Sequence, residues 1–125
     1  MQGDVYKALA EAVRTAGGID IIGVCDGIGR TGVLFSGAQV LQRYVRGRKK
    51  VGVTFNITGA SDTNGQAALV RNLSDICENL RTASYSITGF DNAGAEITSY
   101  PAPIQHDDKT WIYSARIQLN GYIQE

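Results

Sequence analysis

The stretch RGRKKVGVTFNIT, residues 46–58, decides the fold. It opens with a polar turn that contains glycine, and its apolar residues then alternate with small or polar ones, which is typical of a strand with one buried face. Residues 39–45 fit the periods of both a helix and a strand, and the turn that follows favours the strand. We therefore predict a β-hairpin whose second strand is half buried and begins near Val51.

Two amphipathic helices are expected on either side of this hairpin. Residues 4–16 place apolar side chains on one helical stripe, with Asp4 as the N-cap and the glycine pair 17–18 as the stop. A second helix opens at residues 61–66, where Thr63 and Gln66 have capping-box spacing. Its apolar stripe comprises Leu69, Leu73, Ile76, Leu80 and Ala83, flanked by Val70 and Cys77.

The remaining segments predict short strands and turns. Residues 18–24 suggest a strand before a glycine-rich turn at 26–32, which we expect to be flexible and to order in an assembly. Residues 85–90 and 95–100 flank a predicted hairpin loop at 91–94, and Pro101 and Pro103 end that strand or place it at an edge.

The last strand spans residues 111–122, after a turn at 106–109, and Gly121 is read as a bulge. The order of elements predicts an α+β domain with a mostly antiparallel sheet and two helices packed on one face.

Composition sets the limits on function. The chain has 125 residues and equal numbers, 12 and 12, of basic and acidic side chains, which fits one domain over 1–125 and argues against a two-lobed enzyme or a dedicated nucleic-acid binder. We find no signal peptide and no apolar run of membrane-spanning length, so synthesis in a cytoplasm is expected. Cys25 and Cys77 lack metal-ligand spacing and are expected to remain thiols. No metal or cofactor is predicted.

Residues 27–32 match the G-x-G-x-x-G pattern of dinucleotide-binding turns. Two further requirements of that motif are missing. No Asp or Glu occurs between Asp26 and Asp62, and the residues after Gly32 are β-branched, aromatic and interrupted by glycine, which disfavours the helix that should follow.

The same stretch resembles the phosphate loop of cysteine-dependent protein phosphatases. Four residues separate Cys25 from Arg30, whereas that family has five, and Val24 stands where the family has histidine. Asp26 would also place negative charge in an anion site. We predict that the chain is not an enzyme; the alternative hypothesis is a small enzyme that binds phosphate or a nucleotide through residues 25–30. His106, the one histidine, lies in a polar turn and is expected to face solvent.

A wider pattern resembles the minor capsid or tail terminator proteins of long-tailed bacteriophages. After an N-terminal helix, the resemblance is carried by four segments in order: QRYVRG at 42–47, VTFNI at 53–57, the helix over 67–80 and WIYSARIQLNGY at 111–122. It extends over most of the chain from Gln39 onward, while residues 25–32 have no counterpart in that family.

The resemblance implies a structural virion protein at the tail neck, assembled in the host cytoplasm. Such proteins form a homo-oligomeric ring, usually a hexamer, that caps the tail tube protein and offers a surface for head completion or connector proteins in head-tail joining. DNA passes through the lumen without specific binding, and no membrane is involved. We expect contacts to partner subunits or to the tube from the basic hairpin end and the outer face of the second helix. The predicted contact residues are Arg46, Arg48, Lys49, Lys50, Arg71, Asp75 and Glu78.

Overall fold

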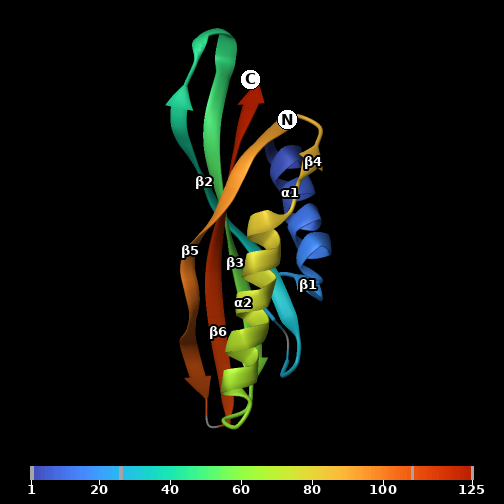
Figure 1. Ribbon diagram of the computed structural model, residues 1–125, viewed down its shortest axis with the longest axis vertical. Coiled ribbons are helices and arrows are strands. Elements are labelled where there is room, and N and C mark those ends of the chain that lie inside the picture. Colours follow the sequence, from blue (N-terminus) through green and yellow to red (C-terminus); the bar gives the residue numbers. More distant parts are fainter. Residues whose placement is uncertain (1, 26, 108, 125) are drawn as a thin grey trace.

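A six-stranded sheet with two helices forms the α+β domain seen in the computed structural model, which describes residues 2–25, 27–107 and 109–124 (Figure 1). The helices are α1 (Gln2–Gly17) and α2 (Gln66–Thr82), and η1 (Val45–Gly47) is a short 3₁₀ turn. The strands are β1 (Ile21–Ile22), β2 (Thr31–Arg43), β3 (Arg48–Ser61), β4 (Ser86–Ile87), β5 (Phe90–Asp107) and β6 (Thr110–Gln124).

The strands are ordered β1-β2-β3-β6-β5-β4 across the sheet. The short β1 pairs in parallel with β2, while the other pairings are antiparallel, so the sheet is mixed. We did not expect this parallel pair. It involves only two residues of the strand predicted at 18–24. Since β1 and β4 are so short, the long strands β2 and β5 form most of the two edges.

The hairpin predicted from residues 46–58 is confirmed as β2, η1 and β3. Both strands are longer than expected: β2 already begins at Thr31, inside the predicted glycine-rich turn, and β3 begins at Arg48. The chain reverses through Arg46 and Gly47, whose φ angles are 65° and 78°. In Figure 1 this hairpin projects beyond both helices at the upper end of the domain.

Both helices are confirmed, but their N-terminal caps differ from expectation. The first starts at Gln2, so Asp4 lies inside it and is not the N-cap. The second starts at Gln66 behind the N-cap Gly65, and no side chain caps it. The predicted capping box is therefore wrong: Gln66 donates from Nε2 to the carbonyl oxygen of Thr63 at 3.1 Å, and Asp62 Oδ1 accepts from the Gly65 amide at 2.7 Å.

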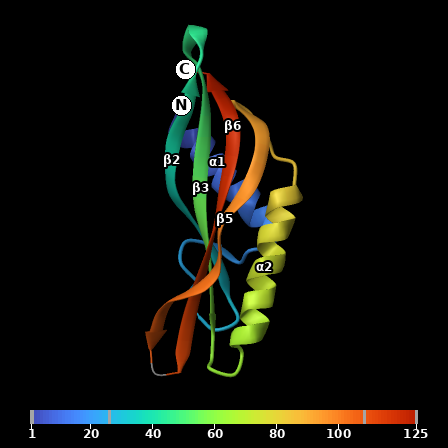
Figure 2. The ribbon, with the colours of Figure 1, turned by 60° about the vertical axis from the view of Figure 1, so that its left-hand side comes forward.

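One hydrophobic core joins the helices to the sheet. Helix α2 packs against β3, β5 and β6, and α1 packs against β2 and α2 (Figure 2). As predicted, alternate residues of β3 and β6 point into this core, together with the stripe of α2. The fully buried large side chains include Leu9, Val53, Phe55, Ile57, Leu73, Leu80, Phe90, Ile117 and Leu119.

The predicted hairpin loop at residues 91–94 is wrong. The chain turns earlier, before Phe90, where Gly89 has a φ of 88°, and β5 runs through residues 91–94 with a register shift between Asn92 and Gly94. The predicted bulge at Gly121 is also wrong, because β6 stays in register with β3 there. Gly121 is needed for packing: a Cβ atom there would lie 2.3 Å from Cζ of Phe90.

Candidate functional site

The basic run predicted from sequence lies at the end of the β2–β3 hairpin. Arg46 and Arg48 are exposed, and the Arg46 carbonyl oxygen accepts a hydrogen bond from Gln124 Nε2, which ties the turn to the end of β6. The Arg48 guanidinium lies 4.7 Å from the ring centroid of Tyr122 and 3.7 Å from Oδ2 of Asp91. These contacts hold cationic groups in place on a surface that remains open to solvent.

Lys49 differs from its neighbours in the run. It is only 7% exposed, so this predicted contact residue is buried within the domain. Alternation along β3 explains the difference, because Lys49 shares a face with the buried Val51 and Val53. Lys50, on the opposite face, has its Nζ atom 6.0 Å from the Tyr122 ring centroid.

The predicted contact residues on α2 form a second surface, away from the hairpin end. Arg71, Asp75 and Glu78 are all exposed, as expected for the outer face of this helix. The Arg81 guanidinium donates to the Glu78 carboxylate and lowers the pKa of Glu78. Figure 1 places α2 in the lower half of the domain, so the structure does not bring the two predicted sets together.

The outer edge of β2 is a surface that the sequence reading missed. Residues 34–43, which we call the β2 edge, have no strand of the described chain on their outer side. Four large apolar side chains there are each about two-fifths exposed: Leu34, Phe35, Val40 and Leu41. Residues 31–42 contain neither a charged residue nor a proline, and this absence is the signal that could have identified the edge.

The opposite edge of the sheet is also open. Residues 92–107 of β5 lack an outer partner among the described strands, and Tyr100 and Ile104 are 70% and 62% exposed. Pro101 and Pro103, which have no N–H to donate, protect part of this edge against pairing. The residues before the prolines, 92–100, are called the β5 edge.

The face of the sheet away from the core is polar, and its charged residues have both signs: Arg48, Lys50 and Arg116 on β3 and β6, and Asp91 and Glu96 on β5. On β3 and β6 it carries residues such as Thr54, Gln118 and Asn120. Arg116 is exposed there and donates from Nε to Oδ1 of Asn56 at 3.0 Å. The described structure thus presents two open edges beside a polar face.

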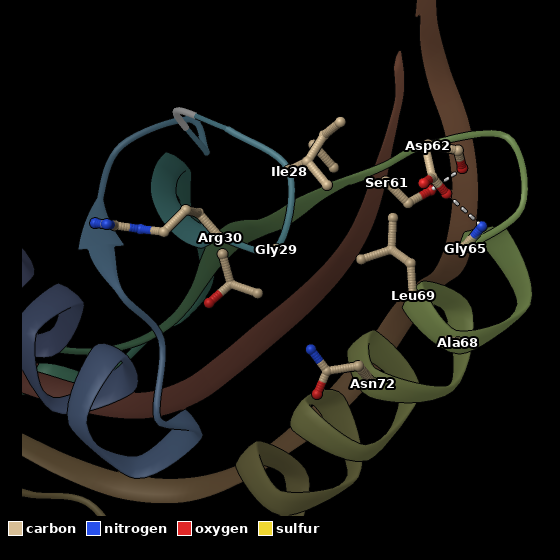
Figure 3. Close-up of a pocket in the computed structure, with 11 residues that line it drawn as sticks. Ile28, Gly29, Arg30, Ser61, Asp62, Gly65, Ala68, Leu69 and Asn72 are labelled. Atoms are coloured by element: carbon tan, nitrogen blue, oxygen red, sulfur yellow. Dashed lines mark hydrogen bonds between the residues drawn. The ribbon is translucent and has the colours of Figure 1, made fainter. Parts of the chain in front are cut away.

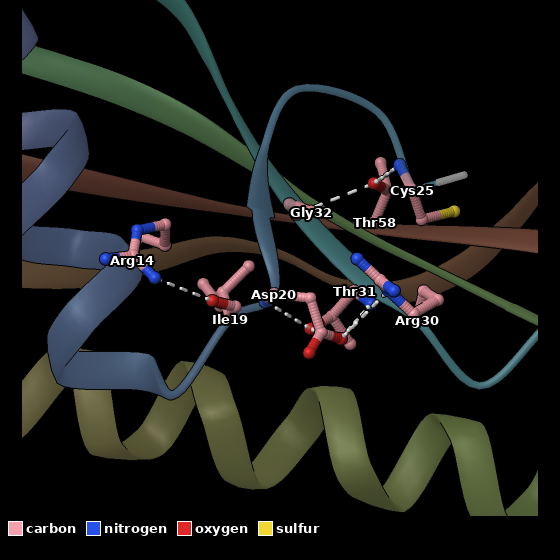
Figure 4. A network of polar contacts seen from close by, with 8 residues as sticks. All are labelled: Arg14, Ile19, Asp20, Cys25, Arg30, Thr31, Gly32 and Thr58. Atoms are coloured by element: carbon pink, nitrogen blue, oxygen red, sulfur yellow. Dashed lines mark hydrogen bonds and ion pairs between the residues drawn. The ribbon is translucent and has the colours of Figure 1, made fainter. Parts of the chain in front are cut away.

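The glycine-rich loop that resembled a phosphate site uses its backbone amides within the protein. The Cys25 amide donates to Thr58 Oγ1 at 3.0 Å (Figure 4). The Gly29 amide donates to the Ala60 carbonyl oxygen at 3.2 Å, and the Arg30 amide to the Gly27 carbonyl oxygen at 3.1 Å. A phosphate loop needs such amides to point at its anion. These three donors are therefore not available to cradle a phosphate.

Asp20 fixes the point where this loop enters the sheet. Its Oδ2 accepts from the Thr31 amide at 2.8 Å and from Thr31 Oγ1 at 3.2 Å, and the Arg30 Nε atom lies 4.0 Å away (Figure 4). The hydrogen bonds from Thr31, and then the charge of Arg30, hold the pKa of Asp20 below its ordinary value. After Thr31 the chain continues as a strand, in place of the helix that a dinucleotide-binding turn requires.

A surface pocket of about 320 Å³ lies between this loop, the end of β3 and the start of α2 (Figure 3). Its lining combines Ile28 and Arg30 with Leu69 of α2 and with Ser61 and Asp62. The Ser61 hydroxyl donates to the Asp62 carbonyl oxygen at 3.0 Å, and the Asp62 carboxylate bonds the Gly65 amide. Among the described residues, its lining contains no histidine and no cysteine.

The remaining chemically reactive side chains do not gather into a site. No disulfide joins Cys25 to Cys77, as expected. Burial, followed by the negative charge of Glu78, raises the pKa of the Cys77 thiol to about 11. His106 is exposed and stacks on Trp111 at 3.9 Å between ring centroids. The expected turn at 106–109 includes residue 108, which is outside the described residues.

Across residues 2–25, 27–107 and 109–124 no group of three or more His, Cys, Asp or Glu side chains is placed to hold a metal ion. Neither helix in the same ranges is long and apolar enough to cross a membrane. Comparison with known proteins found no matching protein-family model and no matching curated protein.

Proposed function

We propose that this chain is a structural subunit of a bacteriophage tail neck, a tail terminator that closes into a ring on the last ring of tail tube protein. The ring, a hexamer by resemblance, stops tube growth and presents a surface to head completion or connector proteins. The observation that carries the proposal is that the sheet has two different open edges, with exposed apolar side chains at both.

Open edges of this kind suit a ring. A strand edge with exposed apolar residues tends to pair with another chain, and natural monomers usually block it. A ring formed by rotation needs two different complementary surfaces on each subunit, since every contact is head-to-tail. The β2 edge and the β5 edge lie on opposite sides of one sheet and are such a pair of surfaces.

The polar face of the sheet suits the lumen of that ring. It is rich in neutral polar residues such as Thr54, Gln118 and Asn120, with Arg116 as its exposed cation on β6. Each phosphate that a protein neutralises strengthens DNA binding. The three cations of this face, Arg48, Lys50 and Arg116, are offset by Asp91 and Glu96, so we expect the lumen to let DNA pass without holding it.

The basic hairpin end is proposed to contact the tail tube or a neighbouring protein. Arg46 and Arg48 are its exposed cations, and Lys49 is left out because it is buried. Reversing both arginines to glutamate is expected to weaken joining to the tube while the melting temperature changes little, since exposed charges contribute little to stability. Lys7→Glu on α1, an exposed charge reversal elsewhere, is the matched control.

The function is tested by mixing the purified chain with tail tubes of the phage that encodes it. We expect the chain to cosediment with the tubes and to appear as a ring at one end of each tube in negative-stain electron micrographs. Tubes that grow to normal length without the chain, together with an absence of end rings, would contradict the proposal.

A further inference from the structure

The two open edges lie at the same level of the sheet. Following the ladder across the strands, Val40 of β2 is opposite Val51 of β3. Val51 is opposite Gly121 of β6, and Gly121 is opposite Asn92 of β5. The start of the β5 edge is therefore level with the second half of the β2 edge.

The blocked parts of the two edge strands also coincide. Gly32 of β2 is opposite Thr58 of β3, which is opposite Ser114 of β6. Ser114 is opposite Ala102, the residue between the two prolines of β5. On its outer side Gly32 is already paired with Ile21 of β1. Each edge is thus closed at this level and open beyond it, toward the hairpin end.

Strand direction permits the two edges to join. The four long strands alternate in direction, so β2 and β5 run in opposite senses, as their arrowheads in Figure 1 show. If a second copy is placed beside the first by rotation about an axis along the strands, its β5 lies antiparallel to β2 of the first copy. The antiparallel ladder then continues from one subunit into the next.

Charge favours the same pairing. Residues 27–61 contain six basic and no acidic side chains, whereas residues 62–108 contain seven acidic side chains and two arginines. Asp91 of β5 pairs with β4, just before the β5 edge, and lies level with Gln42 of β2 through the ladder partners Lys50 and Tyr122. The Asp91 side chain is 76% exposed even with Arg48 beside it, so it remains accessible to a cation of another copy.

We propose that the β2 edge of one copy pairs antiparallel with the β5 edge of the next, so that a continuous sheet runs around the ring. The proposal rests on the ring function above and names its subunit joint. The joint is distinguished by a head-to-tail contact, in which the β2 edge of one copy contacts the β5 edge of the next and never another β2 edge.

The joint is tested by cross-linking between two single-cysteine additions. Ala38 and Ala95 lie at one level, since Ala38 is opposite Val53, and Leu119 links Val53 to Ala95. Ala38→Cys and an affinity-tagged Ala95→Cys variant are mixed and treated with a short bis-maleimide. We expect a cross-linked product that contains both variants, while wild-type protein gives only the background of its own two buried cysteines.

Control variants separate the possible outcomes. Ala102→Cys mixed with Ala38→Cys tests the blocked level and should cross-link at least ten-fold less. A product from Ala38→Cys alone would show a symmetric β2–β2 joint and overturn the proposal, as would a chain that stays monomeric and uncross-linked at its highest attainable concentration. Rings that form and cap tail tubes without the mixed product would refute this joint and leave the proposed function standing. The mixed product without tube binding would support this joint and contradict the proposed function.

Discussion

The glycine-rich loop and the β2 edge are adjacent in the sequence and opposite in character. The loop carries a recognisable motif, yet the amides at Cys25, Gly29 and Arg30 all donate to oxygens of the same chain. The β2 edge carries no motif, yet residues 34–43 leave one side of a long strand open and apolar. The loop with the motif is built into the fold, whereas the segment without charge or proline leaves a strand edge open, which we propose joins copies of this chain.

The two regions differ in where their backbone N–H and C=O groups find hydrogen-bond partners. Buried amides and carbonyls need partners, and a loop that wedges against β3 obtains them from that strand. The outward-pointing N–H and C=O groups of an edge strand have no partner in their own sheet, so water or another chain must form their hydrogen bonds. Four predictions test how far the two regions differ.

The largest effect is expected at the β2 edge. Leu34→Lys combined with Leu41→Lys adds two charges to side chains that are 40% and 41% exposed, so the fold should persist while edge pairing is lost. We expect light scattering on a gel-filtration column to show a monomer, with a melting temperature close to that of wild type. Ile28→Lys, at a 56% exposed apolar residue of the loop, is the control and should leave assembly intact.

A glycine substitution tests whether the loop is structural. In Gly32→Ala the new Cβ atom would lie 2.2 Å from the Gly23 carbonyl oxygen, so the backbone must shift. We expect the free energy of unfolding in urea to fall by about 1–3 kcal/mol, the usual cost of overpacking. Gly27→Ala meets no atom within 4 Å and should change it by less than about 0.5 kcal/mol. Equal losses in the two variants would argue against the tight seating of the loop.

Acid tests the anchor of the loop. Asp20 has a lowered pKa in the folded chain, so its carboxylate stabilises the fold above the unfolded value of 3.8, and this contribution is lost as pH falls through the lower folded value. Asp20→Asn should therefore lose less stability than wild type between about pH 5 and pH 2, as measured by thermal melting. Glu11 and Glu78 also have lowered pKa values and remain in both proteins as a common background. Parallel pH profiles would show that the Thr31 hydrogen bonds contribute nothing through charge.

The smallest effect is expected at the cysteine of the motif. Cys25→Ser should leave the hydrolysis of p-nitrophenyl phosphate at the rate of the buffer blank, in variant and wild type alike, because the neighbouring amides are engaged elsewhere. The thermal melting of each protein confirms that it is folded during the assay. Hydrolysis by wild type that Cys25→Ser abolishes would revive the enzyme hypothesis.

Much of the fold could be predicted from alternation and helical periodicity. The β2–β3 hairpin, the stripe of α2 and the last strand all follow from where apolar residues recur. The positions of turns were harder to predict from the sequence. Residues 91–94 have the composition of a loop, but pairing with β6 keeps them in a strand, and the chain turns at Gly89. Gly121 shows the same limit. Glycine is needed there because the ring of Phe90, thirty-one positions earlier in the chain, leaves no room for a side chain.

The candidate surfaces were less predictable than the fold. The exposed positions Arg46, Arg48, Arg71, Asp75 and Glu78 follow from local polarity, whereas the burial of Lys49 depends on which face of β3 it occupies. The open edges depend on strand order, which a single sequence does not specify. The outer sides of β2 and β5 lack a partner among the described strands along most of their length, because β1 and β4 have two residues each, and this is visible only in the folded sheet.

The claim that the open edges join copies of this chain is tested most directly by native mass spectrometry of the wild-type protein. The account predicts one dominant species with a fixed number of subunits greater than two, as a closed ring requires. A strict monomer at high protein concentration, or a dimer that does not grow further, would contradict it.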